Sequence, residues 1–211
     1  MDVICVIADV VASRASSNRS ALQQVLNKTF RSLNARHKDL LSPYTLTLGD
    51  EFQAVYQSPA RLFSDFTLIQ HAIHPHKVRF SVAIGLLSTP VNPKSAMGMD
   101  GPAFHQARSG ISEMKKNSSL LRVDSASSAV TLPPWINLSL ELISRLQAKW
   151  KQRRFYILHG LLLGSEIPEI VAATRLSSTA VYKNVQIGAI HTIIGLYREI
   201  ALALADAAGK K

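Results

Sequence analysis

The chain has 211 residues, of which 47% are apolar and 18% are charged, and this balance excludes an intrinsically disordered protein. It carries 24 lysines and arginines against 14 aspartates and glutamates. The resulting net charge of +10 favours an anionic partner such as nucleic acid, a nucleotide or a membrane surface. The single cysteine, Cys5, excludes a disulfide framework and a cysteine-based zinc site.

The hydropathy of the sequence bears on its location. No apolar run approaches the ~18 residues that a membrane-spanning helix needs. The first residues lack the basic leader of a secretory signal. From these features we expect a cytoplasmic protein without a membrane partner.

Paired prolines at positions 133 and 134 divide the sequence, because paired prolines interrupt both helices and strands. We predict one domain over residues 1–133 and a second over residues 134–211. The first holds 14 basic and 9 acidic residues, and the second holds 10 basic and 5 acidic residues. Each therefore has a net charge of +5, which is denser in the shorter second domain.

Apolar runs, alternation and turn signals predict the elements of the first domain. We expect strands at 3–8, 44–48, 51–56, 78–85 and 120–123, and helices at about 19–37, 59–74 and 102–116. Their order is βαββαβ with a late helix and strand added. This order predicts an α+β fold of the ferredoxin-like kind, an antiparallel sheet with helices packed on one face.

Two aspartates are expected to meet at one end of this sheet. Asp9 ends the first strand and Asp50 lies in the hairpin between the second and third strands. The first and third strands are central neighbours in the predicted topology, so the two carboxylates should come close. Carboxylate oxygens suit Mg²⁺ or Mn²⁺, with phosphates completing the coordination shell. The alternative is structural, since aspartate commonly ends strands and occupies turns.

Four motifs in this region carry a family resemblance. They are residues 9–14 (DVVASR), 47–53 (TLGDEFQ), 79–85 (RFSVAIG) and 99–108 (MDGPAFHQAR). In this order they resemble the SatD family. The same stretch is more distantly similar to the catalytic domains of class III nucleotidyl cyclases and of GGDEF-type diguanylate cyclases.

The cyclase resemblance implies roles for particular residues. It implies metal binding by Asp9 and Asp50, and nucleotide binding by Ser13, Arg14, Gly49 and Glu51. In an enzyme, His105 and Arg108 would correspond to the pair of side chains that acts in the transition state. Leu48 departs from the GGDEF pattern, where a glycine stands. Nucleotide binding is therefore favoured over cyclisation.

The second domain is predicted to be all-α. Helices are expected at about 136–152, 154–163 and 167–174, with a further helix from residue 178. The stretch 170–182 resembles a helix-turn-helix in which Ala172 and Ala173 permit close helix contact, and Val181 and Val185 point inward. The expected DNA-facing residues are Ser178, Thr179, Tyr182, Lys183 and Gln186. The alternative is a helical hairpin used for packing or dimerisation, since the usual turn glycine is absent.

The last apolar run, 187–207, favours a homodimer through a C-terminal helix, with binding to a membrane surface as the weaker alternative. The function that combines these features is a DNA-binding transcriptional regulator with a cyclase-like domain that senses a nucleotide and a metal ion, Mg²⁺ or Mn²⁺. The alternatives are a metal-dependent nucleotide cyclase or nucleotidyltransferase, and a protein-interaction module without a ligand.

Overall fold

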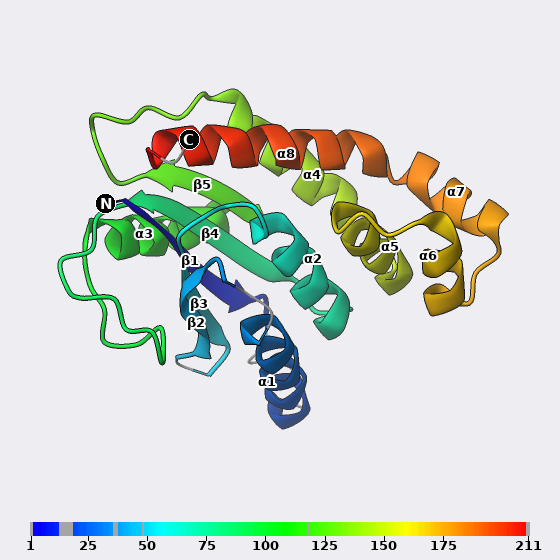
Figure 1. Ribbon diagram of the computed structural model, residues 1–211, viewed down its shortest axis with the longest axis horizontal. Coiled ribbons are helices and arrows are strands. Elements are labelled where there is room, and N and C mark those ends of the chain that lie inside the picture. Colours follow the sequence, from blue (N-terminus) through cyan, green and yellow to red (C-terminus); the bar gives the residue numbers. More distant parts are fainter. Residues whose placement is uncertain (1, 13–18, 36–37, 48, 118, 210–211) are drawn as a thin grey trace.

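The computed structural model describes residues 2–12, 19–35, 38–47, 49–117 and 119–209 (Figure 1). Three residues discussed above, Ser13, Arg14 and Leu48, lie outside this part of the chain. The strands are β1 (Val3–Val10), β2 (Leu40–Leu46), β3 (Glu51–Tyr56), β4 (Val78–Gly85) and β5 (Leu121–Ser125). The helices are α1 (Arg19–Asn34), α2 (Leu62–Ile73), α3 (Pro102–Asn117), α4 (Trp135–Gln147), α5 (Gln152–Leu162), α6 (Ile167–Thr174), α7 (Ser178–Ile187) and α8 (Ile190–Ala207).

The five strands form one mixed sheet in the order β2-β3-β1-β4-β5. Strand β1 lies between β3 and β4 and is antiparallel to both, and β2 is antiparallel to β3. Strand β5 is parallel to β4. The fold is therefore α+β, but the prediction of a wholly antiparallel sheet is wrong. The late helix and strand form a crossover through α3, and a crossover of this kind lays the next strand parallel to the first.

Helices cover both faces of the sheet, although helices on one face were predicted. Ile4, Val6 and Ala8 of β1 join the apolar cluster that contains α1 and α2. Cys5 and Ile7 join a second cluster with α3. Because successive side chains of a strand point to opposite faces, α3 covers the face opposite to α1 and α2. The unbroken apolar run of β1 carries this signal, since a strand that is buried on both faces shows no alternation.

The helical segment packs directly on the sheet and on α2. The rings of Phe63 in α2 and Tyr197 in α8 stack with centroids 4.2 Å apart. Ser144 of α4 accepts a hydrogen bond from the backbone of Leu120 beside β5 at 3.3 Å. One apolar cluster runs from the sheet through α2 into the helical segment. The division at residues 133 and 134 stays a prediction, and the two parts share this core.

Helix α8 runs back along α4 toward the end of the sheet where the chain begins (Figure 1). Its apolar side chains are mostly buried within the same chain, namely Ile190, Ile193, Ile194, Tyr197, Ile200 and Leu204. Leu202 remains 61% exposed. The apolar surface that suggested a partner for this helix is thus largely covered by the rest of the chain.

Helix α4 shows the opposite pattern, with an exposed apolar stripe. The helix buries Ile136, Leu140 and Ile143. Leu138, Leu142 and Leu146, which recur at helical spacing, are exposed. No described helix is both long and apolar enough to cross a membrane alone, and only α7 with α8, bent by 57° at their junction, match such a span in length and composition.

Candidate functional site

Strand register brings together three charged residues at one end of the sheet. Asp9 lies within β1, one residue before the last residue of the strand, Val10. It stands opposite Glu51 of β3 on one side and opposite Arg79 of β4 on the other. Along each strand, these three residues alternate with residues whose side chains face α1 and α2. Their side chains therefore belong to the face that α3 covers.

The charges in this group are paired by two cations from α3. The Asp9 carboxylate lies 3.4 Å from Arg79 Nη1 and 3.2 Å from Lys115 Nζ, and its side chain is only 12% exposed. Glu51 pairs with Arg108 at 3.1 Å. We call these five residues the sheet-end cluster. Each carboxylate in the cluster is held by at least one cation of the chain itself.

Asp50 lies beside this cluster and pairs in another direction. Its carboxylate is 3.8 Å from the guanidinium of Arg19 in α1, on the opposite face of the sheet from α3. Gly49 has φ +71°, a left-handed conformation that glycine adopts without strain. The backbone oxygen of Asp50 accepts from Val10 N at 3.3 Å. The carboxylate that the register places opposite Asp9 is that of Glu51.

Whether the sheet end can bind a divalent cation depends on the carboxylates of Asp9 and Glu51. In the described ranges, no group of three or more His, Cys, Asp and Glu side chains is arranged to hold a metal ion. Asp9 and Glu51 supply two carboxylates on neighbouring strands. A cation between them would need further oxygen ligands, such as phosphate, and would take the place of Lys115 and Arg108.

The two residues of α3 that were predicted to act in the transition state, His105 and Arg108, contact different partners. Arg108 reaches the hairpin through Glu51, at 3.1 and 3.3 Å. His105 instead pairs with Asp100 at 2.7 Å, and both side chains are exposed. Hydrogen bonds from the Gly101 backbone and then from His105 lower the pKa of Asp100. Thus α3 places Arg108, and not His105, at the sheet end.

Sequence reasoning missed Arg79, Lys115 and Arg19. Arg79 had a visible signal, because it interrupts the apolar pattern of a strand next to the central one. In the described part of the chain, Arg79 Nε and Ser81 Oγ are buried without a hydrogen-bond partner. Gly110 of α3 lies over Ser81, and a Cβ at this position would overlap the Ser81 hydroxyl. A small residue is therefore needed for α3 to approach β4 this closely.

The α6–α7 pair presents a second candidate surface. Ser177 Oγ accepts from Ala180 N at 3.2 Å and caps α7. Val181 and Val185 are buried, as predicted. The other predicted positions are exposed, namely Ser178, Thr179, Tyr182, Lys183 and Gln186. Ala172 and Ala173 are also exposed, so the expectation that they mediate close helix contact is wrong.

The family of the chain follows from its sequence over this region. Residues 3–187 match the SatD family. The chain belongs to the SatD family. The predicted family is therefore confirmed, and the matching region runs from β1 to the end of α7. No curated protein matches this SatD-family chain.

A solved structure of a bacterial light-regulated adenylyl cyclase is weakly similar to this SatD-family chain. The TM-score is 0.40 and the sequence identity is 14%. The match covers 57% of this chain and 42% of that structure's chain. The SatD-family chain thus matches less than half of the cyclase chain.

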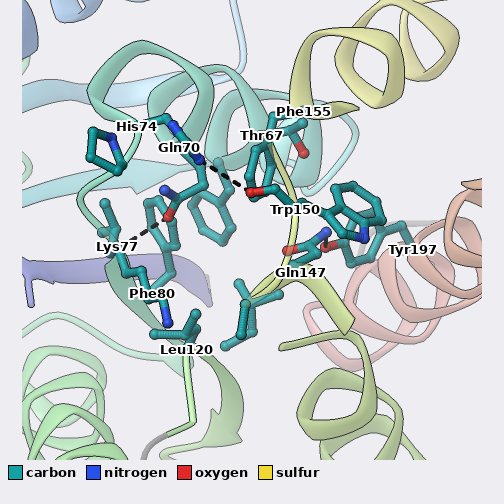
Figure 2. Close-up of a pocket in the computed structure, with 15 residues that line it drawn as sticks. Thr67, Gln70, His74, Lys77, Phe80, Leu120, Gln147, Trp150, Phe155 and Tyr197 are labelled. Atoms are coloured by element: carbon teal, nitrogen blue, oxygen red, sulfur yellow. Dashed lines mark hydrogen bonds between the residues drawn. The ribbon is translucent and has the colours of Figure 1, made fainter. Parts of the chain in front are cut away.

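A cavity of about 50 Å³ lies where the sheet of the SatD-family chain meets its helical segment. Figure 2 shows the residues that line it. Phe80, Trp150 and Tyr197 are among its apolar walls. His74 Nε2 contacts the Trp150 carbonyl at 3.1 Å, and Gln147 donates to the Tyr197 hydroxyl at 3.2 Å. A cavity of this size holds a few water molecules and is far too small for a nucleotide. The cavity belongs to the packed junction between the two parts of the chain.

Proposed function

We propose that this SatD-family chain is a DNA-binding transcriptional regulator, with α6 and α7 acting as a helix-turn-helix. The observation that carries the proposal is the α7 surface, where five hydroxyl, amide and cationic side chains are exposed along one capped helix. Such a mixture suits phosphates and base edges in the major groove. The buried Val181 and Val185 hold the opposite side of α7 in the core.

The connection between the two helices supports this assignment without a glycine. Arg175 has φ +55° and caps α6 in the left-handed conformation that a turn glycine would otherwise supply. Its side chain is exposed beside the start of α7. Beyond α7, a hollow lined by Tyr182, Gln186, His191 and Thr192 extends the polar surface onto α8. Together with Lys183, Arg175 supplies the positive charge that contacts to DNA phosphates require.

The sheet part of the chain is proposed to be a cyclase-like, ferredoxin-like sensor of a nucleotide with Mg²⁺ or Mn²⁺. The first four strands follow the βαββαβ order along the chain that suggested a ferredoxin-like fold from the sequence. In the sheet they are neighbours in the order β2-β3-β1-β4. Asp9 and Glu51 stand opposite each other at one end of this sheet, and Gly49 and Asp50 lie in the hairpin beside them. The carboxylates would hold the cation, and the phosphates of the nucleotide would complete its shell.

A homodimer is part of the proposal, because helix-turn-helix proteins read palindromic sites as two copies. The exposed Leu138, Leu142 and Leu146 of α4 offer an apolar stripe for such a contact. Size-exclusion chromatography with light scattering should give a molar mass of twice the 23.1 kDa chain mass. A monomer at every concentration would contradict this part of the proposal.

DNA binding is tested with labelled, sheared genomic fragments in an anisotropy titration over a range of salt concentrations. Lys183→Gln and Tyr182→Ala should weaken binding severalfold, and wild-type affinity should fall steeply with salt because phosphate contacts release counterions. Lys28→Gln is the matched control, since Lys28 is an exposed cation on α1, far along the chain from α7. Binding that is insensitive to both variants and to salt would contradict the proposal.

The second candidate is a metal-dependent nucleotide cyclase or nucleotidyltransferase. The Asp9 and Glu51 carboxylates with Arg108 facing the hairpin favour it. Incubation with each NTP and Mg²⁺ or Mn²⁺ tests this function by chromatography of the products. A product that disappears in Asp9→Asn and Asp50→Asn, but not in the surface control Asp206→Asn, would make the enzyme the primary function.

A further inference from the structure

A cleft separate from the cavity of Figure 2 lies between the sheet and helix α4. Its volume is about 360 Å³, which falls within the range of small-ligand sites. Polar side chains from three places line it, namely Lys77 and Arg79 at the start of β4, Asn117 and Ser119 between α3 and β5, and Glu141 and Arg145 of α4.

The lining of this cleft is positively charged. It contains three cations and one carboxylate. Glu141 pairs with Arg145 at 2.7 Å, and Arg79 pairs with Asp9 beyond the cleft wall at 3.4 Å. Lys77 is exposed and forms no ion pair within the described residues. The cleft therefore carries cationic charge that no ion pair among the described residues neutralises.

An unsatisfied donor lies in the same wall. Asp9 contacts only the Nη1 atom of Arg79, whereas Arg79 Nε is buried and has no hydrogen-bond partner in the described part of the chain. Buried donors in native structures nearly always have an acceptor. The Arg79 guanidinium therefore keeps donor capacity beyond its contact with Asp9. This second observation favours an anion over a neutral ligand in the cleft.

We propose that the cleft binds the phosphate group of a small anionic ligand between Lys77 and Arg79 on the sheet and Arg145 on α4. Guanidinium and ammonium groups are the side chains that bind phosphate best, through charge-assisted hydrogen bonds. Arg145 is 73% exposed and is free to turn from Glu141 toward the ligand. A bound phosphate would join the sheet to the helical segment. The proposal depends neither on DNA binding nor on a metal at the sheet end.

The test is a calorimetric titration of the full chain with inorganic phosphate, at constant ionic strength and without metal, nucleotide or DNA. Saturable binding is expected, and both Lys77→Gln and Arg145→Gln should weaken it at least tenfold. Lys28→Gln, an exposed cation on α1, should bind as the wild type does. Glu141→Gln should tighten binding, because it removes the carboxylate of the cleft and frees Arg145.

Thermal unfolding shows whether each variant is folded, and all four changes are at exposed or half-buried side chains. A parallel titration with adenosine monophosphate identifies the source of the phosphate. Tighter binding of the monophosphate that is also lost in Lys77→Gln assigns the site to a nucleotide, and equal affinities assign it to free phosphate. Absence of saturable binding overturns the proposal. So does an equal loss in Lys28→Gln, which would mean nonspecific attraction to a basic protein.

Discussion

The sheet end and the α7 surface use polar side chains in opposite ways. At the sheet end, Asp9 and Glu51 are shielded, and cations of the same chain hold them at 3.1–3.4 Å. On α7, Tyr182 and Lys183 are exposed, with no hydrogen bond or ion pair to another described side chain. The first region satisfies its charges internally, and the second leaves its polar groups to solvent or a partner.

The difference separates stability from binding. Removing one member of a buried ion pair leaves the other charge without compensation, so it costs folding free energy. Removing an exposed side chain costs little stability. Variants at the sheet end should therefore act first on unfolding, and variants on α7 should act first on binding. The four predictions below test this division.

The largest effect is expected for Asp9→Ala, which should lower the free energy of unfolding by about 3 kcal/mol. The change leaves Arg79, whose side chain is 15% exposed, facing no carboxylate, and removes a partner of Lys115. Urea denaturation followed by circular dichroism measures it. Asp206→Ala on α8, an exposed aspartate, is the control and should unfold as the wild type does. A stable Asp9→Ala protein would mean that the sheet end is kept for binding and not for stability.

A smaller gain in stability is expected for Arg175→Gly. Arg175 has φ +55°, and a residue with a Cβ is strained there by about 1 kcal/mol relative to glycine. Arg175→Ala keeps this strain while removing the charge, so it should not share the gain. The midpoint of thermal unfolding compares the three proteins. If the alanine variant gains as much as the glycine variant, charge repulsion and not backbone strain is the cause.

Local sequence signals predicted the elements well where pattern and packing agree. The expected strands 51–56 and 78–85 match β3 and β4, because turn residues bound each of them. The expected burial of Val181 and Val185 is also confirmed, since they are four residues apart on one helical face. The helix on the second face of the sheet was not predicted. The unbroken apolar run of β1 indicated a buried strand, but it was not used to infer that helices cover both faces.

Charge pairing was the part that the sequence could not supply. The proximity of Asp9 to Arg79 and Lys115 depends on strand register and on how α3 lies over the sheet, and both are set by distant residues. Asp50 stood out by its turn motif, whereas Glu51 is the residue opposite Asp9 in the register. Likewise, the leucines of α4 have helical spacing whether they face the core or solvent. Only the packing of Ile136, Leu140 and Ile143 decides which.

A pH-dependent effect is expected where α2 meets the helical segment. Burial lowers the pKa of His71 below its ordinary 6.5, although the hydrogen bond to the Gln152 backbone opposes the shift. The unfolded chain therefore binds the proton more tightly, so the free energy of unfolding should fall as the pH drops from about 6.5 toward the folded-state pKa, and should level off below it. Denaturation series between about pH 5 and pH 7.5 measure this slope. His71→Gln should flatten it, and an unchanged slope would assign the effect to other groups.

The smallest effect is expected for Arg145→Gln on α4. Its partner Glu141 is one helical turn away, and the two side chains are 73% and 45% exposed. Pairs of this kind contribute about 0.3–0.5 kcal/mol, and salt screens them, so the midpoint of urea denaturation should move only slightly. The same variant should lose phosphate binding in the cleft. A large loss of stability would show that Arg145 supports the contact of α4 with the sheet. The effect of this exposed cation on binding could then not be distinguished from its effect on folding.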